Sequence, residues 1–101
     1  MKNKMIIWSA EASSDIFECF KFVKNISEKS AINLFKEVKE SVNSLIDFPE
    51  RNPVFKHIKM LNITIRKLVI NKRYLVLYHV DVDKIVIDRV LDSRRNFGSL
   101  L

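Results

Sequence analysis

The side chains best suited to chemistry in this sequence are basic, and most of them lie in its second half. Arg94 and Arg95 follow the apolar segment IVIDRVLDS, and Arg66 and Arg89 lie within apolar runs. An arginine guanidinium is a planar fork of N–H donors that matches phosphate and carboxylate groups. These arginines therefore suit contact with a negatively charged target, or neutralisation of charge in a transition state. The alternatives are an ion pair with a neighbour for Arg89 and a solvated surface charge for the others.

The two histidines and the lysines beside them form a second group of candidates. Lys56, His57 and Lys59 make a basic cluster just ahead of the apolar segments. Because imidazole changes its charge near neutral pH, His57 or His79 could serve as a general acid or base. The alternatives are an exposed loop residue for His57 and a structural histidine with satisfied ring nitrogens for His79, whose neighbours in YLVLYHV are mostly apolar.

Metal and cofactor chemistry have no support in the sequence. One cysteine, two histidines and one glycine cannot supply a zinc pattern or a glycine-rich phosphate loop. Asp81 and Asp83 fall at a predicted turn, where aspartate commonly bonds to its own backbone. Cys19 lies among phenylalanines and is expected to be a small buried hydrophobe. We therefore expect no metal and no cofactor.

Charge is distributed unevenly along the chain. Residues 1–50 contain seven Lys/Arg against eight Asp/Glu, a net of −1, whereas residues 51–101 contain eleven against four, a net of +7. No acidic residue occurs between Arg51 and Val80. Such segregation favours a polyanionic or acidic partner, and the alternative is a basic protein with well-solvated charges.

These side chains must be positioned by 101 residues, a length typical of one domain with one core. Residues 4–8, KMIIW, predict a first strand. Apolar residues at helical spacing predict a helix from Ala10 to about Ile26, with Ser9 as its N-cap, and a break over residues 27–30. A second helix should bury a stripe of seven residues and end at Phe48-Pro49. The stripe consists of Ala31, Leu34, Phe35, Val38, Val42, Leu45 and Ile46.

Three further strands are predicted, at residues 63–70, 73–80 and 84–91. They are separated by two and three residues, which are hairpin lengths, so they should form an antiparallel meander. The order β-α-α-β-β-β predicts an α+β two-layer fold, with a helical hairpin packed on one face of a mainly antiparallel sheet. The opposite face of the sheet remains for a function or a partner. The aromatic residues Trp8, Tyr74 and Tyr78 are expected in the core or at the edges of the sheet.

Strict alternation makes a further prediction for the last strand. Ile85, Ile87 and Leu91 should share one face with Arg89. The opposite face should then carry Asp88 and its valine neighbours at 86 and 90.

Nothing in the sequence predicts export or membrane insertion. The apolar run Met5–Trp8 is too short for a signal-peptide core, and no segment reaches the roughly 18 apolar residues of a membrane span. A single cysteine is compatible with a reducing compartment. We therefore expect a cytoplasmic protein without a membrane partner.

Three segments, taken in order, resemble a known family. They are MIIWSAEASSDIFECFKFV, SLIDFPERNP and IRKLVINKRYLVLYHVDVDKIVIDRVLDSRRNF. With the β-α-α-β-β-β order, they resemble the RelE/ParE superfamily of bacterial type II toxin–antitoxin toxins, to which plasmid stabilisation proteins belong. The resemblance covers nearly the whole chain. It implies a single toxin domain over residues 1–101, neutralised by a cognate antitoxin protein.

The superfamily implies two possible mechanisms. RelE-like members cut mRNA in the ribosomal A site, whereas ParE-like members act on DNA gyrase and have no established catalytic residues. RelE-like ribonucleases often carry an arginine after the tyrosine that opens the strand matching RYLVLYHV, where this chain has Leu75. The tyrosine that RelE carries a few residues beyond the matching basic position has no obvious counterpart here; Phe97 is the nearest aromatic residue and has no hydroxyl. Both departures favour a ParE-like toxin that poisons DNA gyrase. A ribosome-dependent mRNA endoribonuclease is the alternative, which leaves catalysis undecided.

The residues implied for the site depend on the mechanism. Expected contacts with the target are Lys56, Lys59, Arg66, Arg89, Arg94 and Arg95. For an endoribonuclease, the expected catalytic residues are His57, His79, Arg94 and Arg95. A third hypothesis, a plain nucleic-acid-binding or structural domain, predicts that expression without a neighbouring antitoxin is harmless.

Overall fold

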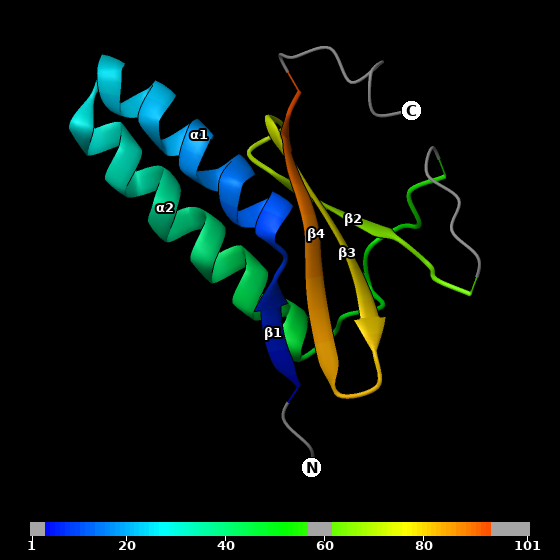
Figure 1. The fold of residues 1–101 in the computed structure, drawn as a ribbon. Coiled ribbons are helices and arrows are strands. Elements are labelled where there is room, and N and C mark those ends of the chain that lie inside the picture. The colour runs from blue at the N-terminus through cyan, green and yellow to red at the C-terminus, as the bar shows by residue number, and fades with distance from the viewer. Residues whose placement is uncertain (1–3, 57–61, 94–101) are drawn as a thin grey trace.

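The structure is a computed structural model that describes residues 4–56 and 62–93 (Figure 1). The described elements follow the predicted order β-α-α-β-β-β, with a 3-10 turn after the second helix. They are β1 (Met5–Trp8), α1 (Ala10–Ile26), α2 (Glu28–Asn43), η1 (Ser44–Ile46), β2 (Arg66–Ile70), β3 (Tyr74–Asp81) and β4 (Lys84–Asp92).

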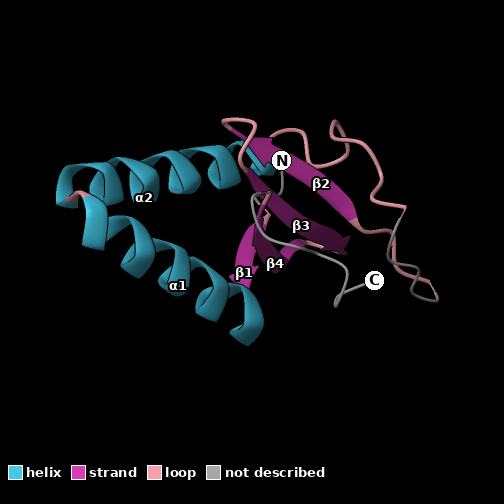
Figure 2. Ribbon diagram, turned by 90° about the horizontal axis from the view of Figure 1, so that it is seen from above, coloured by secondary structure: helices cyan, strands magenta, loops and turns pink. Residues whose placement is uncertain are grey.

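The four strands form one sheet in the order β1-β4-β3-β2. Strands β2, β3 and β4 make the predicted antiparallel meander, and β1 pairs in parallel with β4. Both helices lie on the same face of this sheet and form a second layer, as Figures 1 and 2 show. The prediction of a two-layer α+β fold is therefore confirmed.

The helical hairpin turns at a single residue. Ser27 has extended backbone angles, and its side-chain oxygen accepts a hydrogen bond of 3.2 Å from the Ser30 backbone N–H. An N-cap of this kind satisfies a donor that the first helical turn leaves unpaired. Because Ser27 both ends α1 and caps α2, the predicted break over residues 27–30 is wrong and α2 begins at Glu28.

Strand β2 begins three residues later than predicted. Its ladder with β3 starts where Arg66 pairs with Tyr78. Beyond that point the chain bonds to the segment before it: the Phe55 N–H donates to the Ile65 carbonyl at 2.8 Å, and Val54 bridges Arg66. The preceding loop therefore covers part of the outer edge of β2, where an unpaired edge would invite association.

The main core lies between the helices and the sheet. It contains the fully buried side chains of Val42, Val76 and Tyr78, together with those of Ala12 and Ala31. Cys19 is buried in the same cluster, which confirms its expected role as a small hydrophobe. Trp8 packs against this core while Tyr74 and Tyr78 lie within it, as expected for the aromatic residues.

A β-bulge changes the faces of β4. Tyr78 pairs with Ile87 and Leu77 with Arg89, so β4 carries one residue more than β3 at this point. An extra residue reverses the alternation of side chains beyond it. The prediction from strict alternation is therefore wrong: Val90 joins Ile87 in the helix-facing core, and Leu91 belongs to a cluster apart from it.

The sheet face away from the helices is partly covered. A second apolar cluster is made of Phe55, Ile65, Leu77 and Leu91, with Ile63 and Leu75 packed against it. Leu77 is only 1% exposed, although it points away from the main core. The loop between η1 and β2 therefore packs on part of the face that was expected to remain for a function or a partner.

Candidate functional site

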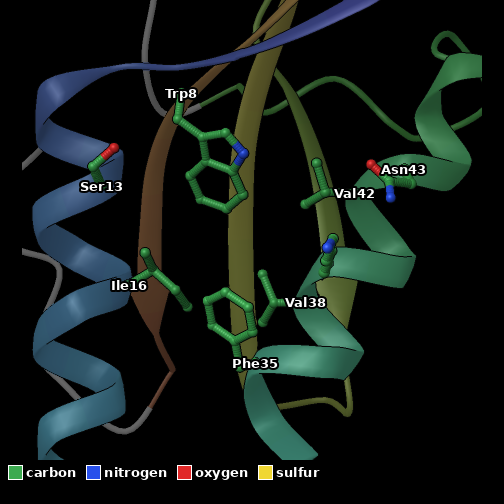
Figure 3. A pocket seen from close by; sticks show the side chains of 8 residues that line it. Trp8, Ser13, Ile16, Phe35, Val38, Val42 and Asn43 are labelled. Atoms are coloured by element: carbon green, nitrogen blue, oxygen red, sulfur yellow. The ribbon is translucent and has the colours of Figure 1, made fainter. Parts of the chain in front are cut away.

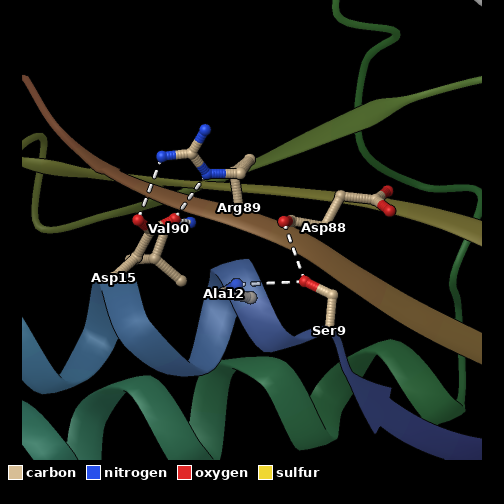
Figure 4. Close-up of polar contacts among 6 residues, drawn as sticks. All are labelled: Ser9, Ala12, Asp15, Asp88, Arg89 and Val90. Atoms are coloured by element: carbon tan, nitrogen blue, oxygen red, sulfur yellow. Dashed lines mark hydrogen bonds and ion pairs between the residues drawn. The ribbon is translucent and has the colours of Figure 1, made fainter.

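Arg89 is held in an ion pair with the first helix. Its Nε donates to Asp15 Oδ2 at 2.7 Å and its Nη2 donates to Asp15 Oδ1 at 3.0 Å (Figure 4). This two-point pairing raises the pKa of the guanidinium, which stays charged. The alternative that the sequence left open, an ion pair with a neighbour, is confirmed. A role for Arg89 in binding a target stays a prediction.

The same carboxylate also completes the edge of the sheet. Strand β1 pairs with β4 only as far as Ile87, so the next residues of β4 pair with β3 on one side and have no neighbouring strand on the other. Asp15 Oδ2 accepts a hydrogen bond of 2.9 Å from the Val90 N–H, and the Ser9 hydroxyl donates to the Asp88 carbonyl at 3.0 Å (Figure 4). The first turns of α1 therefore satisfy backbone groups that would otherwise be exposed or unpaired.

Arg66 holds the loop that follows η1. Its Nη1 donates to the Asn52 carbonyl at 2.8 Å. In the same network the buried Tyr78 hydroxyl donates to the Pro49 carbonyl at 2.6 Å and accepts from Asn52 Nδ2 at 3.1 Å. Burial raises the pKa of Tyr78, so its hydroxyl stays a donor at neutral pH. The structure therefore gives Arg66 an internal partner, and its target contact stays a prediction.

His79 forms a pair with Asp88 across the meander. Its Nδ1 lies 2.7 Å from Asp88 Oδ2, and the side chains are 17% and 28% exposed respectively. Burial raises the pKa of Asp88, while the hydrogen bond from His79 acts in the opposite direction. Of the two ring nitrogens that the structural alternative expected to be satisfied, Nδ1 has a partner. Its other ring nitrogen, Nε2, has no hydrogen-bond partner among the described residues.

The candidate residues do not converge on one point within the described part of the chain. Arg66 lies on β2 and Arg89 on β4, with β3 between them, so their backbones are about 10 Å apart. Lys56 is exposed in the loop between η1 and β2. The remaining candidates, His57, Lys59, Arg94 and Arg95, lie outside the described residues. Within residues 4–56 and 62–93, no three His, Cys, Asp or Glu side chains gather as metal ligands would.

One surface feature was not predicted from the sequence. It is a hollow between α1 and α2, which we call the interhelical groove, with a volume of about 290 Å³ at its wider end. Figure 2 shows the helices diverging away from their connection, and Figure 3 shows the side chains that fill the space between them. The groove is lined by Trp8, Ser13, Ile16, Phe17, Phe20, Phe35, Val38, Lys39, Val42 and Asn43.

Phe35 shows why the groove escaped prediction. The spacing of the stripe places it on the buried face of α2, yet its side chain is 54% exposed and makes an edge-to-face contact with Phe20 at 6.5 Å between centroids. Phe17, opposite on α1, is 58% exposed. Periodicity identifies an apolar face but does not say whether a neighbouring helix covers it. Apolar side chains clustered on a surface in this way usually mark a binding site.

No helix in the described ranges combines the length and the apolar character needed to cross a membrane.

Comparison with known proteins agrees with this architecture. A solved structure described as the chromosomal ParDE TA system from P. aeruginosa matches with a TM-score of 0.70 and 16% identity, covering 88% of this chain and 95% of that one. At this identity the likeness shows the fold alone. A search of curated proteins found no match. The sequence model of the family described as ParE toxin of the type II toxin–antitoxin system, parDE, matches residues 6–97. This chain therefore belongs to the ParE toxin family of type II toxin–antitoxin systems.

Proposed function

We propose that this protein inhibits DNA gyrase in the cytoplasm and is neutralised by a cognate antitoxin. The family match over residues 6–97 carries this proposal. The described arginines add support, because Arg66 and Arg89 are engaged in contacts that hold the fold. An inhibitor that acts by binding needs a rigid, complementary surface and no convergent catalytic groups. The basic second half of the chain, with its net charge of +7, supplies the matching electrostatic field.

The target surface of this proposal includes Lys56, Lys59, Arg94 and Arg95. A direct test measures supercoiling by purified gyrase with increasing amounts of the toxin. The unchanged protein should block supercoiling, and the double variant Arg94→Ala/Arg95→Ala should lose that inhibition while keeping its thermal unfolding transition. Full inhibition by the double variant would remove these two arginines from the proposed target surface.

The antitoxin is proposed to occupy the interhelical groove with an amphipathic helix. The groove is apolar where Ile16 and Val38 line it, and the exposed rings of Phe17 and Phe35 border it. A helix laid in such a groove buries one apolar face, the recognition mode of many peptide-binding proteins. Lys39 lines the same groove and can pair with an acidic residue on the polar side of that helix.

A second candidate function, RNA cleavage on the ribosome, is favoured by one observation. Asp88 holds Nδ1 of His79, which is the arrangement that orients a histidine for general-base catalysis through Nε2. Such a base would take the proton of a ribose 2′-hydroxyl. Primer extension on ribosome-bound mRNA would reveal cuts in the A site, and His79→Gln should abolish them. Intact transcripts would exclude this function.

A further inference from the structure

A polar cavity lies beside α2, on a different face of the helix from the interhelical groove. Its volume is about 320 Å³. Ser30, Asn33 and Glu37, which lie one helical turn apart, form one wall, and Asn71 and Arg73 from the β2–β3 turn form the other. Apolar side chains of the main core close its floor. The cavity therefore joins a cation, a carboxylate, two amides and a hydroxyl around one hollow.

Arg73 is the unusual member of this lining. Its Nε is buried and has no hydrogen-bond partner among the described residues. The guanidinium lies over the Tyr74 ring, 5.2 Å from the centroid. Its backbone is fixed, because the Arg73 N–H donates to the Ile70 carbonyl and the Ser93 N–H donates to the Arg73 carbonyl at 2.7 Å. A buried donor without an acceptor is destabilising and calls for an explanation.

Arg89, in the same half of the chain, can be compared directly with Arg73. Arg89 also presents Nε at the side of its guanidinium, and there Nε and Nη2 together bind the two oxygens of Asp15. Arg73 has the same group but makes no ion pair with any described carboxylate. A carboxylate from outside the described chain would give Arg73 Nε the kind of acceptor that Asp15 gives Arg89.

The other residues that line the cavity favour a ligand with a single negative charge. Arg73 is the one cation among the residues that line the cavity, and Glu37 adds a negative charge. A doubly charged phosphate would meet one positive group and be repelled by another negative one. A single carboxylate leaves room for hydrogen bonds from the amides of Asn33 and Asn71. The volume is sufficient for a side chain the size of glutamate.

We propose that this cavity binds a carboxylate group, held side-on by Arg73 with hydrogen bonds from Asn33 and Asn71, and that Glu37 limits its affinity. Binding turns the guanidinium so that Nε gains the acceptor it lacks. The carboxylate comes either from a free small molecule or from an acidic side chain of a protein segment. The residues that line this cavity differ from those of the interhelical groove, and the proposal does not rest on the function proposed above.

The side-chain Nε–H signals of arginine report this event directly by NMR. The full-length protein is titrated with acetate, and separately with a blocked alanine-rich peptide that has one central glutamate. The Arg73 Nε–H signal should shift saturably with both probes, while the Arg89 Nε–H signal stays in place. Chloride at equal ionic strength, and the same peptide with glutamine in place of glutamate, should leave both signals unchanged. Peptide binding at least about tenfold tighter than acetate identifies a protein segment as the source, and equal affinity identifies a free carboxylate.

Two substitutions should change the affinity for the carboxylate in opposite directions, which a non-specific effect would not do. Arg73→Lys should weaken binding by about tenfold, because a charge-assisted bond to the fork is lost. Glu37→Gln should tighten it several-fold, since a like charge is removed. Lys72→Ala, which removes a neighbouring cation that does not line the cavity, should change affinity little. A fixed Arg73 Nε–H signal with both probes, or equal weakening by Lys72→Ala and Arg73→Lys, would overturn the proposal.

Discussion

Single residues in this protein join parts of the chain that are distant in sequence. Asp15 is the clearest case, because one carboxylate receives a guanidinium and a backbone N–H from residues more than 70 positions away. Nothing in the sequence around Asp15 predicts this contact, since it looks like an ordinary residue of the first helical turns. What the sequence does provide is the type of group, an acid at the start of a helix and an arginine in a strand.

Removing this carboxylate should therefore destabilise the fold. Asp15→Ala leaves a partly buried guanidinium and the Val90 N–H without an acceptor, so we expect the free energy of unfolding to fall by about 2–3 kcal/mol. Glu18→Ala is the matched control on the same helix. Its ion pair with Lys21 is more than half exposed on both sides, so the change should stay within about 0.5 kcal/mol. Equal losses in urea denaturation would show that the pair with Arg89 contributes nothing special.

The pair formed by His79 and Asp88 makes a pH-dependent prediction. Burial raises the pKa of Asp88 above its ordinary value of 3.8, so its charged form is disfavoured in the folded state. The carboxyl of Asp88 therefore lowers stability at neutral pH, and this penalty is relieved as the pH falls through the raised pKa toward 3.8.

Carbon NMR of the Asp88 carboxyl should give a midpoint above 3.8. Replacing His79 with Leu should move that midpoint higher, because the hydrogen bond from His79 lowers the pKa. A midpoint that falls in the variant would contradict the pairing seen in the structure.

At the scale of elements, local sequence signals predicted the helix cap and the order of the strands, but not every detail of strand register or helix packing. Ser9 caps α1 as expected, with its side chain accepting from the Ala12 N–H at 3.0 Å, and the short connections correctly predicted the meander. The bulge in β4, opposite Leu77 and Tyr78, could not be predicted, because Val90 and Leu91 beyond it are both apolar and both buried. The exposure of Phe35 could not be predicted from periodicity either, since it depends on how far the two helices diverge.

The β3–β4 turn contains a residue that is poorly suited to its backbone. The strands pair up to Asp81 and Lys84, so the loop has two residues, and the first, Val82, has a φ of 56°. A β-branched residue is disfavoured there, whereas glycine is preferred. Val82 is 85% exposed and loses no packing when shortened.

Val82→Gly should consequently stabilise the protein by about 1 kcal/mol, measured by thermal or urea unfolding. The same substitution in a regular strand serves as the control. Val69 lies in β2 and is 54% exposed, so Val69→Gly should destabilise. Destabilisation by both changes would mean that the strain at Val82 has no energetic weight.

On the scale of the whole molecule, the two halves of the sequence differ in net charge and form different surfaces. The helical layer carries the interhelical groove and comes from the half of the sequence with a net charge of −1, whereas the meander belongs to the half with +7. The interhelical groove, where we propose that the antitoxin binds, and the proposed target surface therefore come from different halves of the chain. The charge asymmetry was visible in the sequence, but the groove required the structure.

Neutralisation should depend on the groove. Phe35→Ala removes a half-exposed ring that lines it, so antitoxin binding should weaken by about 30-fold or more while stability changes by no more than about 1 kcal/mol. Ile26→Ala is the control, because Ile26 is 73% exposed and lines no part of the groove. Binding is measured by calorimetry with the antitoxin encoded beside the toxin gene. Undiminished binding by the Phe35 variant would place the antitoxin elsewhere.

The central claim, inhibition by binding to DNA gyrase, is tested most directly by two assays on one purified sample. Supercoiling of relaxed plasmid by gyrase and primer extension on ribosome-bound mRNA are measured across the same range of toxin concentrations. We predict that supercoiling is blocked and that transcripts remain intact. Cuts in the ribosomal A site with gyrase fully active at large molar excess of toxin would contradict the claim.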